Sequence, residues 1–170
     1  NCKSDSINIK KNENQILFYD NIVLKTDDMI INTDAMEYDY EKEKIKYFKG
    51  GYVITKDYNV NSQNFVYDLN SGISEFDDKI NMKNSEYDIF SKHIECDGDV
   101  IKFLGETYIQ GNNFTIDCIK GYLKKSEILE LSNGIILNTE NKIITANKLK
   151  RNIKKNENYF EKNIHINIDE

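Results

Sequence analysis

The sequence predicts an all-β fold, and three observations lead to this prediction. Apolar and polar residues alternate with a period of two over short runs, which is typical of strands with one buried and one exposed face. These runs are rich in Ile, Val, Tyr, Phe and Thr, which strands favour. Turn-forming Asn, Asp and Gly recur roughly every ten residues, the rhythm of an all-β sandwich or barrel. At that rhythm, the 170 residues hold about fifteen short strands.

The alternating runs also predict which side chains share the inner face of the sheet. "NFVYDL", "KINMK", "SEYDIF" and "NFTIDC" are the clearest runs in the middle of the chain, and "NIHINID" lies close to its end. The expected inward residues are Phe65, Tyr67, Phe76, Met82, Tyr87, Ile89, Phe114 and Ile116, and a last alternating set near the C-terminus comprises Ile164, Ile166 and Ile168.

Residues 27–48 are the best candidate for a helix, because a charged "YEKEKIKY" run lies within them. Aromatic and aliphatic residues nevertheless alternate on both sides of the charged tip, with Tyr38 and Tyr40 before it and Ile45 and Tyr47 after it. We therefore predict two strands joined by a polar turn.

A seven-residue pattern recurs along the chain: a small residue, two polar or small residues, an apolar residue, any residue, an apolar or aromatic residue, and Asp. It occurs as "TDAMEYD" at 33–39, "SQNFVYD" at 62–68 and "GNNFTID" at 111–117, with a degenerate copy "ANKLKRN" at 146–152. A turn residue and an apolar strand precede each copy. Repeats of this kind bury their apolar face by stacking on their neighbours, so we expect one shared interior.

Composition and charge limit the functional classes. Hydrophobic residues make up 39% and charged residues 31% of the chain, as in an ordinary folded protein. The net charge of −6 argues against binding to nucleic acid, which normally requires a basic face. We interpret basic patches as solvated faces; the example near the C-terminus, the basic cluster, comprises Lys148, Lys150, Arg151, Lys154 and Lys155.

The sequence offers little that could support catalysis. His93 shares a strand face with Glu95, but two candidate ligands do not make a metal site. The acids in Asp27–Asp28 and in Asp77–Asp78 are adjacent, so they point to opposite faces of a strand and cannot act together. No nucleophile motif or phosphate-binding loop is present. We therefore predict a protein that is not an enzyme and that has no catalytic residues, metal or other cofactor.

The cysteines leave alternatives open. "NCKSDS" at the start resembles the mature N-terminus of a bacterial lipoprotein, in which Cys2 would carry the lipid; a plain cysteine is the alternative. We expect residues 1–14 to form a flexible tether and residues 15–170 to form a single domain. Cys96 and Cys118 could form a disulfide in an oxidising compartment, or could be two small core residues.

The repeated pair of strands, a turn-G-x-V strand followed by I-x-[small]-x-x-[apolar]-x-Tyr-Asp, resembles the OstA/LptA/LptC family of periplasmic lipopolysaccharide transport proteins. The resemblance covers about residues 16–150. It implies an open, twisted β-jellyroll of stacked antiparallel strands, whose hydrophobic groove takes the acyl chains of lipopolysaccharide or a related glycolipid. In that fold the eight inward residues of the middle of the chain would line the groove.

The resemblance also implies partners and a location. An LptC-type single jellyroll would lie in the periplasm, anchored to the inner membrane by a lipid on Cys2 or by an N-terminal helix trimmed from this sequence. It would receive lipid from an inner-membrane ABC transporter and pair its C-terminal edge, at Ile164, Ile166 and Ile168, with the next jellyroll. The alternative is a structural β-repeat module, a β-solenoid or surface scaffold, with a solid core. The uneven steps and the aromatic residues of the pattern favour the jellyroll.

Overall fold

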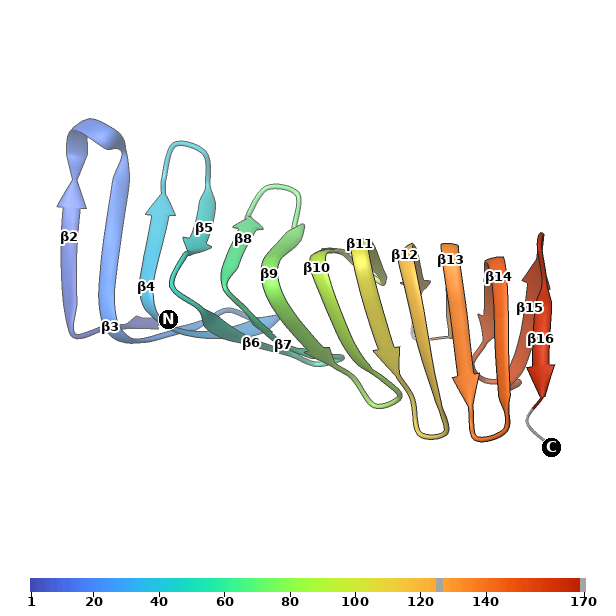
Figure 1. Ribbon diagram of the computed structural model, residues 1–170. Coiled ribbons are helices and arrows are strands. Elements are labelled where there is room, and N and C mark those ends of the chain that lie inside the picture. Colours follow the sequence, from blue (N-terminus) through green and yellow to red (C-terminus); the bar gives the residue numbers. More distant parts are fainter. Residues whose placement is uncertain (125–126, 169–170) are drawn as a thin grey trace. The chain divides into compact units, whose positions relative to one another are not determined.

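The computed structural model describes residues 1–124 and 127–168, and the chain divides into two compact units, residues 1–85 and residues 86–170 (Figure 1). The first unit contains β1 (Cys2–Lys3), β2 (Ser6–Lys10), the 3-10 turn η1 (Lys11–Glu13), β3 (Gln15–Lys25), β4 (Met29–Asp39), β5 (Lys44–Tyr47), β6 (Gly51–Thr55), β7 (Asn59–Ser62), β8 (Asn64–Asp68) and β9 (Ser74–Lys83). The second unit contains β10 (Asp88–Asp97), β11 (Val100–Gln110), β12 (Phe114–Lys124), β13 (Ile128–Thr139), β14 (Lys142–Asn152), β15 (Glu157–Glu161) and β16 (His165–Ile168).

Pairing inside each unit is antiparallel. In the second unit β10 to β14 form a continuous meander, in which each strand pairs with the next along the chain, and both β15 and β16 pair with β14 (Figure 1). In the first unit β4 pairs with β3 on one side and with β5 and β6 on the other. The predicted all-β jellyroll class is confirmed. The described residues contain no helix long and apolar enough to cross a membrane.

The long strands are bent near their middle. The register between β3 and β4 shifts between Tyr19 and Ile22, and comparable shifts interrupt each pairing from β10 to β14. Residues with positive φ lie at these shifts, either as a successive pair, such as Asp20 (59°) and Asn21 (50°), or as the single Gly105 (90°) in β11. A β-bulge of this kind bends the strand and increases its twist. One half of a strand can therefore fold over the other half and enclose an interior.

The described residues form sixteen strands, close to the predicted fifteen, but the bends correct the predicted strand lengths. Some of the recurring Asn, Asp and Gly residues that the sequence predicts as turn formers, including Asp20–Asn21 and Asn133–Gly134, lie instead at bends inside β3 and β13. Asn, Asp and Gly suit both places because they tolerate left-handed backbone. The chain therefore forms long bent strands, such as the 12-residue β13, as well as short ones.

The bends also explain the seven-residue pattern. Its small first residue stands beside a bend in three of the four copies, at Thr33, Ser62 and Ala146. The copy at 111–117 does not follow this rule, because its first residue, Gly111, lies in the hairpin between β11 and β12 and not beside a bend. Ser91 and Cys118 occupy the equivalent small positions, so the bends recur at an almost even spacing instead of the uneven one expected.

Hydroxyl groups at the bends satisfy backbone carbonyls that the strand ladder leaves open. Thr33 donates to the carbonyl of Gly50 at 2.8 Å, and Ser62 donates to the carbonyl of Asn64 at 2.9 Å. Ser91 and Thr107 hydrogen bond each other at 2.9 Å inside the second unit. Buried polar groups need such partners, which explains why small hydroxyl residues occupy these positions.

Apolar side chains fill the interior of each unit. In the first unit the rings of Tyr47 and Phe65 stack 5.1 Å apart, and Phe65 and Phe76 lie 4.9 Å apart. The ring of Tyr47 also lies over Gly51, where an added Cβ would be 2.8 Å from it, so the turn-G-x-V strand needs its glycine. In the second unit the row Ile89–Ile109–Ile116 runs across three neighbouring strands.

The N-terminal residues take part in the sheet of the first unit. β2 pairs with the first half of β3, from Ser6 opposite Tyr19 to Lys10 opposite Gln15, and β1 pairs with its second half. The flexibility of residues 1–14 and the extent of a single domain over residues 15–170 remain predictions.

We expect the buried hydrogen bond between Tyr47 and Ser62 to stabilise the first unit. The two hydroxyl oxygens are 2.6 Å apart, and these residues are only 1% and 2% exposed. Ser62→Ala leaves the Tyr47 hydroxyl buried without its acceptor, and should lower the free energy of unfolding by about 1–3 kcal/mol. Urea denaturation followed by tyrosine fluorescence measures this change.

Two further variants isolate the interaction. Tyr47→Phe should cost less in the Ser62→Ala background than in the parent chain, with a coupling on the order of 1 kcal/mol. Ser85→Ala removes an exposed hydroxyl and should change nothing. Additive effects of the two buried substitutions would contradict the assignment.

Candidate functional site

The candidate site is the apolar interior that the bent strands enclose, taken separately for each unit. In the first unit Phe65, Phe76 and Met82 are buried and Tyr67 is half-buried. Phe65 is opposite Tyr47 and Phe76 in the ladder, whereas its chain neighbour Val66 is opposite Lys46 and Glu75. This alternation assigns Phe65 to the inner face and Val66 to the outer face.

The expected residues of the second unit also lie on its inner face. Tyr87, Ile89 and Ile116 are buried, and Phe114 is half-buried. The rings of Tyr87 and Phe114 meet edge to face, with their centroids 6.0 Å apart. Burial raises the pKa of the Tyr87 hydroxyl, and a hydrogen bond from Arg151 partly opposes this rise. The role of these residues in lining a lipid groove remains a prediction.

The interior is larger than the sequence pattern predicts. The inner faces also contain buried residues whose runs are interrupted by bends or by short gaps, so that their alternation is harder to follow. These include Ile22, Ile31, Val53, Val60, Phe103, Ile109, Leu123, Leu129 and Leu149. Treating the positive-φ pairs as bends would have continued the alternation through them.

The basic cluster near the C-terminus has both outward and inward members. Lys148, Lys150 and Lys154 lie on the outside, where they form ion pairs with Glu161, Glu130 and Glu127. Arg151 instead contacts the ring of Phe114, with 4.7 Å between its guanidinium carbon and the ring centroid. The interpretation of the cluster as a solvated face is therefore wrong for Arg151.

The C-terminal set of alternating isoleucines lies at an exposed edge. Ile164, Ile166 and Ile168 are 44%, 55% and 61% exposed. β16 pairs with Lys142–Thr145 of β14, and no second partner strand for β16 is found among the described residues. Such an edge has backbone groups available for another strand, but its docking role remains a prediction.

The side chains that could bind a metal ion do not lie together in the part of the chain that the structure describes. The described residues contain no group of three or more His, Cys, Asp or Glu side chains placed to hold a metal ion. The Glu95 carboxylate forms an ion pair with Lys102 on the neighbouring strand.

Cys96 and Cys118 are both buried and do not form a disulfide, so in this structure they are small core residues. Cys2 is exposed and lies in β1, opposite Leu24. Its lipidation remains a prediction.

Comparison with known proteins gives one family match. The family described as "OstA-like protein" matches residues 1–92, which include the whole first unit and end inside β10. None of the curated proteins matches the chain.

Among solved structures, the chain is similar to LptH from Pseudomonas aeruginosa, described as the LptA homologous periplasmic component of the lipopolysaccharide transport device. The sequence identity is 8%, and the alignment covers 100% of this chain and 94% of LptH with a TM-score of 0.41.

The cysteines should differ strongly in reactivity. Burial, reinforced by the nearby charge of Asp117, raises the pKa of Cys118 from 9.0 to about 12. Only the thiolate attacks alkylating reagents, so at pH 8 this shift alone should slow the alkylation of Cys118 roughly a thousandfold. Iodoacetamide followed by mass spectrometry should therefore label Cys2 in the folded protein.

Protein unfolded in urea provides the control, in which all three cysteines should react at similar rates. Labelling of Cys118 in the folded protein at the rate of Cys2 would contradict the packed position of Cys118.

Proposed function

The chain belongs to the OstA-like family, and from this membership and its geometry we propose that it is a periplasmic lipid carrier. It binds acyl chains of lipopolysaccharide or a related glycolipid between the two halves of its bent strands. It passes the lipid from an inner-membrane ABC transporter toward the outer membrane. The protein is not an enzyme in this proposal, because carriage requires no covalent step.

The observation that carries the proposal is the continuous apolar row on the inner face of each unit. In the second unit the row crosses neighbouring strands through Ile89, Ile109, Ile116 and Leu137. An acyl chain in contact with such a row gains about 0.8 kcal/mol for each buried CH₂ group. Several carbons therefore supply affinity without any polar contact, as suits a carrier that must also release its lipid.

Lipid entry requires the two halves of the bent strands to separate at their free ends. The bulges provide hinges for this movement, because ladder hydrogen bonding is already interrupted there. The half-buried aromatic residues Tyr67 and Phe114 lie nearer solvent than the fully buried residues of their rows. We therefore assign the first contacts with lipid to these two side chains, and later contacts to Phe65, Met82 and Ile116.

The exposed edges suit the assembly that transport requires. In the proposal the β16 edge, with Ile164, Ile166 and Ile168, receives a strand of the next jellyroll protein by backbone pairing. The N-terminal end, as in an LptC-type protein, stays close to the inner membrane through a lipid on the exposed Cys2 or through a preceding helix.

One observation favours a second candidate function. The inner residues are packed against one another, and Phe76, Met82, Ile89 and Ile116 are all 0% exposed. A structural β-repeat module with a permanently solid core would show the same packing. The two functions differ in whether lipid ever reaches the inner face.

Photo-crosslinking in cells distinguishes carriage from a solid core. A benzophenone side chain replaces Tyr67 in one variant and Phe114 in another, because half-buried aromatic positions tolerate the larger group better than packed ones. We expect adducts to a glycolipid at both positions, and mass spectrometry identifies the lipid.

Matched controls carry the benzophenone on the outer face of the same units, at Val66 and at the exposed Phe90. They should give no lipid adduct. If folded protein gives no adduct at the inner positions, or equal adducts on both faces, the carrier proposal is wrong and the structural module becomes the better explanation.

The edge is tested separately. Placing acidic residues on β16 with Ile166→Asp and Ile168→Asp should prevent a second strand from pairing there, since charge at an edge opposes pairing. Chemical crosslinking in cells should then lose the adduct with the next jellyroll protein. Ile136→Asp, on an exposed surface outside β16, serves as control, and an undiminished adduct in the β16 variant would exclude this edge.

A further inference from the structure

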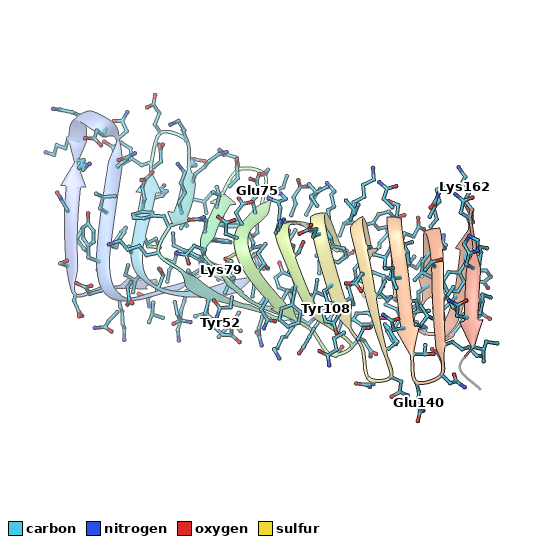
Figure 2. All side chains as sticks on the ribbon, viewed as in Figure 1. Tyr52, Glu75, Lys79, Tyr108, Glu140 and Lys162 are labelled. Carbon is cyan, nitrogen blue, oxygen red and sulfur yellow. The ribbon has the colours of Figure 1, made fainter. Side chains whose placement is uncertain are left out.

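A polar cavity of about 490 Å³ lies wholly within the second unit, beside the half-buried Phe114. Its lining combines an apolar floor of Tyr87, Phe114 and Leu137 with the side chain of Arg151 and several asparagines. The hairpin between β13 and β14 contributes Glu140, which Figure 2 shows at the tip of that hairpin. The cavity is therefore apolar toward the core and polar toward solvent.

Arg151 reaches this cavity across the interior of the unit. In the ladder Arg151 is opposite Leu129 and Asn158, whereas Phe114 is opposite Thr139. The contact between the guanidinium and the Phe114 ring therefore does not follow the ladder. It joins the half of β14 after its bend to the half of β12 before its bend, and places the positive charge at the mouth between the two halves.

The guanidinium is held in place by uncharged groups. Nη1 donates to Oδ1 of Asn158 at 2.8 Å and Nη2 donates to Oδ1 of Asn156 at 2.7 Å. Nε is buried and has no acceptor among the described residues. The Tyr87 hydroxyl also accepts a hydrogen bond from Arg151. An arginine has five N–H donors, so these bonds still leave part of its donor set available.

The charge on Arg151 differs from that on its neighbours. The outward Lys148, Lys150 and Lys154 all form ion pairs with glutamates. Arg151 instead donates to two asparagine amide oxygens and to the Tyr87 hydroxyl, which are all uncharged. Arg151 is also the only arginine in a lysine-rich chain. A planar guanidinium binds phosphate through two parallel hydrogen bonds, which a lysine cannot do.

We propose that this cavity is a head-group site, in which Arg151 binds a phosphate group of a phosphorylated glycolipid. The amides of Asn112, Asn113 and Asn141 and the carboxylates at the rim then bind the sugar hydroxyls. The acyl chains extend past Phe114 into the interior. This inference rests on the proposed function, because it assigns the polar end of the same lipid.

The experiment compares two probes that differ only in phosphate: fluorescently labelled lipid A in its phosphorylated form and the same lipid after dephosphorylation. Equilibrium binding to the full chain should show a preference of roughly tenfold for the phosphorylated form, as expected for a charge-assisted hydrogen-bonded pair. Arg151→Gln should abolish the preference by weakening only the phosphorylated lipid. Arg151→Lys keeps the charge without the planar fork, and should retain part of the preference.

Lys56→Gln is the matched control, because it removes one positive charge from an exposed turn of the first unit. It should leave both affinities unchanged. Binding of the dephosphorylated lipid shows whether each variant is folded, so a loss of preference cannot be mistaken for unfolding. If Arg151→Gln proves unstable, Arg151→Lys alone decides, and a full preference in that variant would overturn the assignment.

The remaining outcomes separate this inference from the proposed function. If the parent chain binds both lipids equally, the head-group site is wrong and carriage stands. If it binds neither lipid, both are wrong. If inorganic phosphate alone binds as tightly as the phosphorylated lipid, with the same dependence on Arg151, the site takes free phosphate and the head-group assignment is overturned.

Discussion

The β-bulge in each long strand is the constraint on which the rest of this structure depends. A straight antiparallel strand presents its apolar residues to one plane, and a sheet of such strands needs a second layer to cover them. At Asp20–Asn21 and at Asn133–Gly134 the chain instead enters left-handed backbone for two residues and turns its second half over its first. Each strand then contributes to both sides of the interior, which is why Arg151 and Phe114 can meet across it.

The sequence predicted which residues share a face of a strand better than it predicted where the strands bend. Alternation alone placed Phe65, Ile89 and Ile116 on the inner face, because a period of two leaves no other choice once one neighbour is buried. The bends were interpreted as hairpin turns, because Asn, Asp and Gly tolerate left-handed backbone both in bends and in hairpin turns. Which of the two forms depends on the partner strand, and local sequence does not contain that information. Arg151 was missed for a related reason, because a run of basic residues suggested a solvated surface although Leu149 beside it was clearly apolar.

Ion pairs lie on the outer face of the second unit, and its two inner cysteines do not form a disulfide. Both features are compatible with the proposed opening of the interior. Lys148 and Lys150 on the outer face of β14 form ion pairs with glutamates of neighbouring strands. The Lys150 and Tyr122 hydrogen bonds to Glu130 hold the pKa of that carboxyl below its usual range. Inside the second unit, Cys96 and Cys118 do not form a disulfide. The halves of the strands are therefore held together by packing and by isolated contacts such as that of Arg151, and not by a crosslink that would limit their separation.

The regular return of the bends at Thr33, Ser62, Ser91, Cys118 and Ala146 has a consequence for how such a chain evolves. Each interval between successive bends contains the second half of one strand, a hairpin and the first half of the next strand. Its inner residues form part of the interior. Tandem duplication of one interval in the gene would add a complete hairpin without altering the pairing rule of its neighbours. Chains of this architecture can therefore gain or lose whole intervals, while each interval keeps its own bend and its own pair of strands.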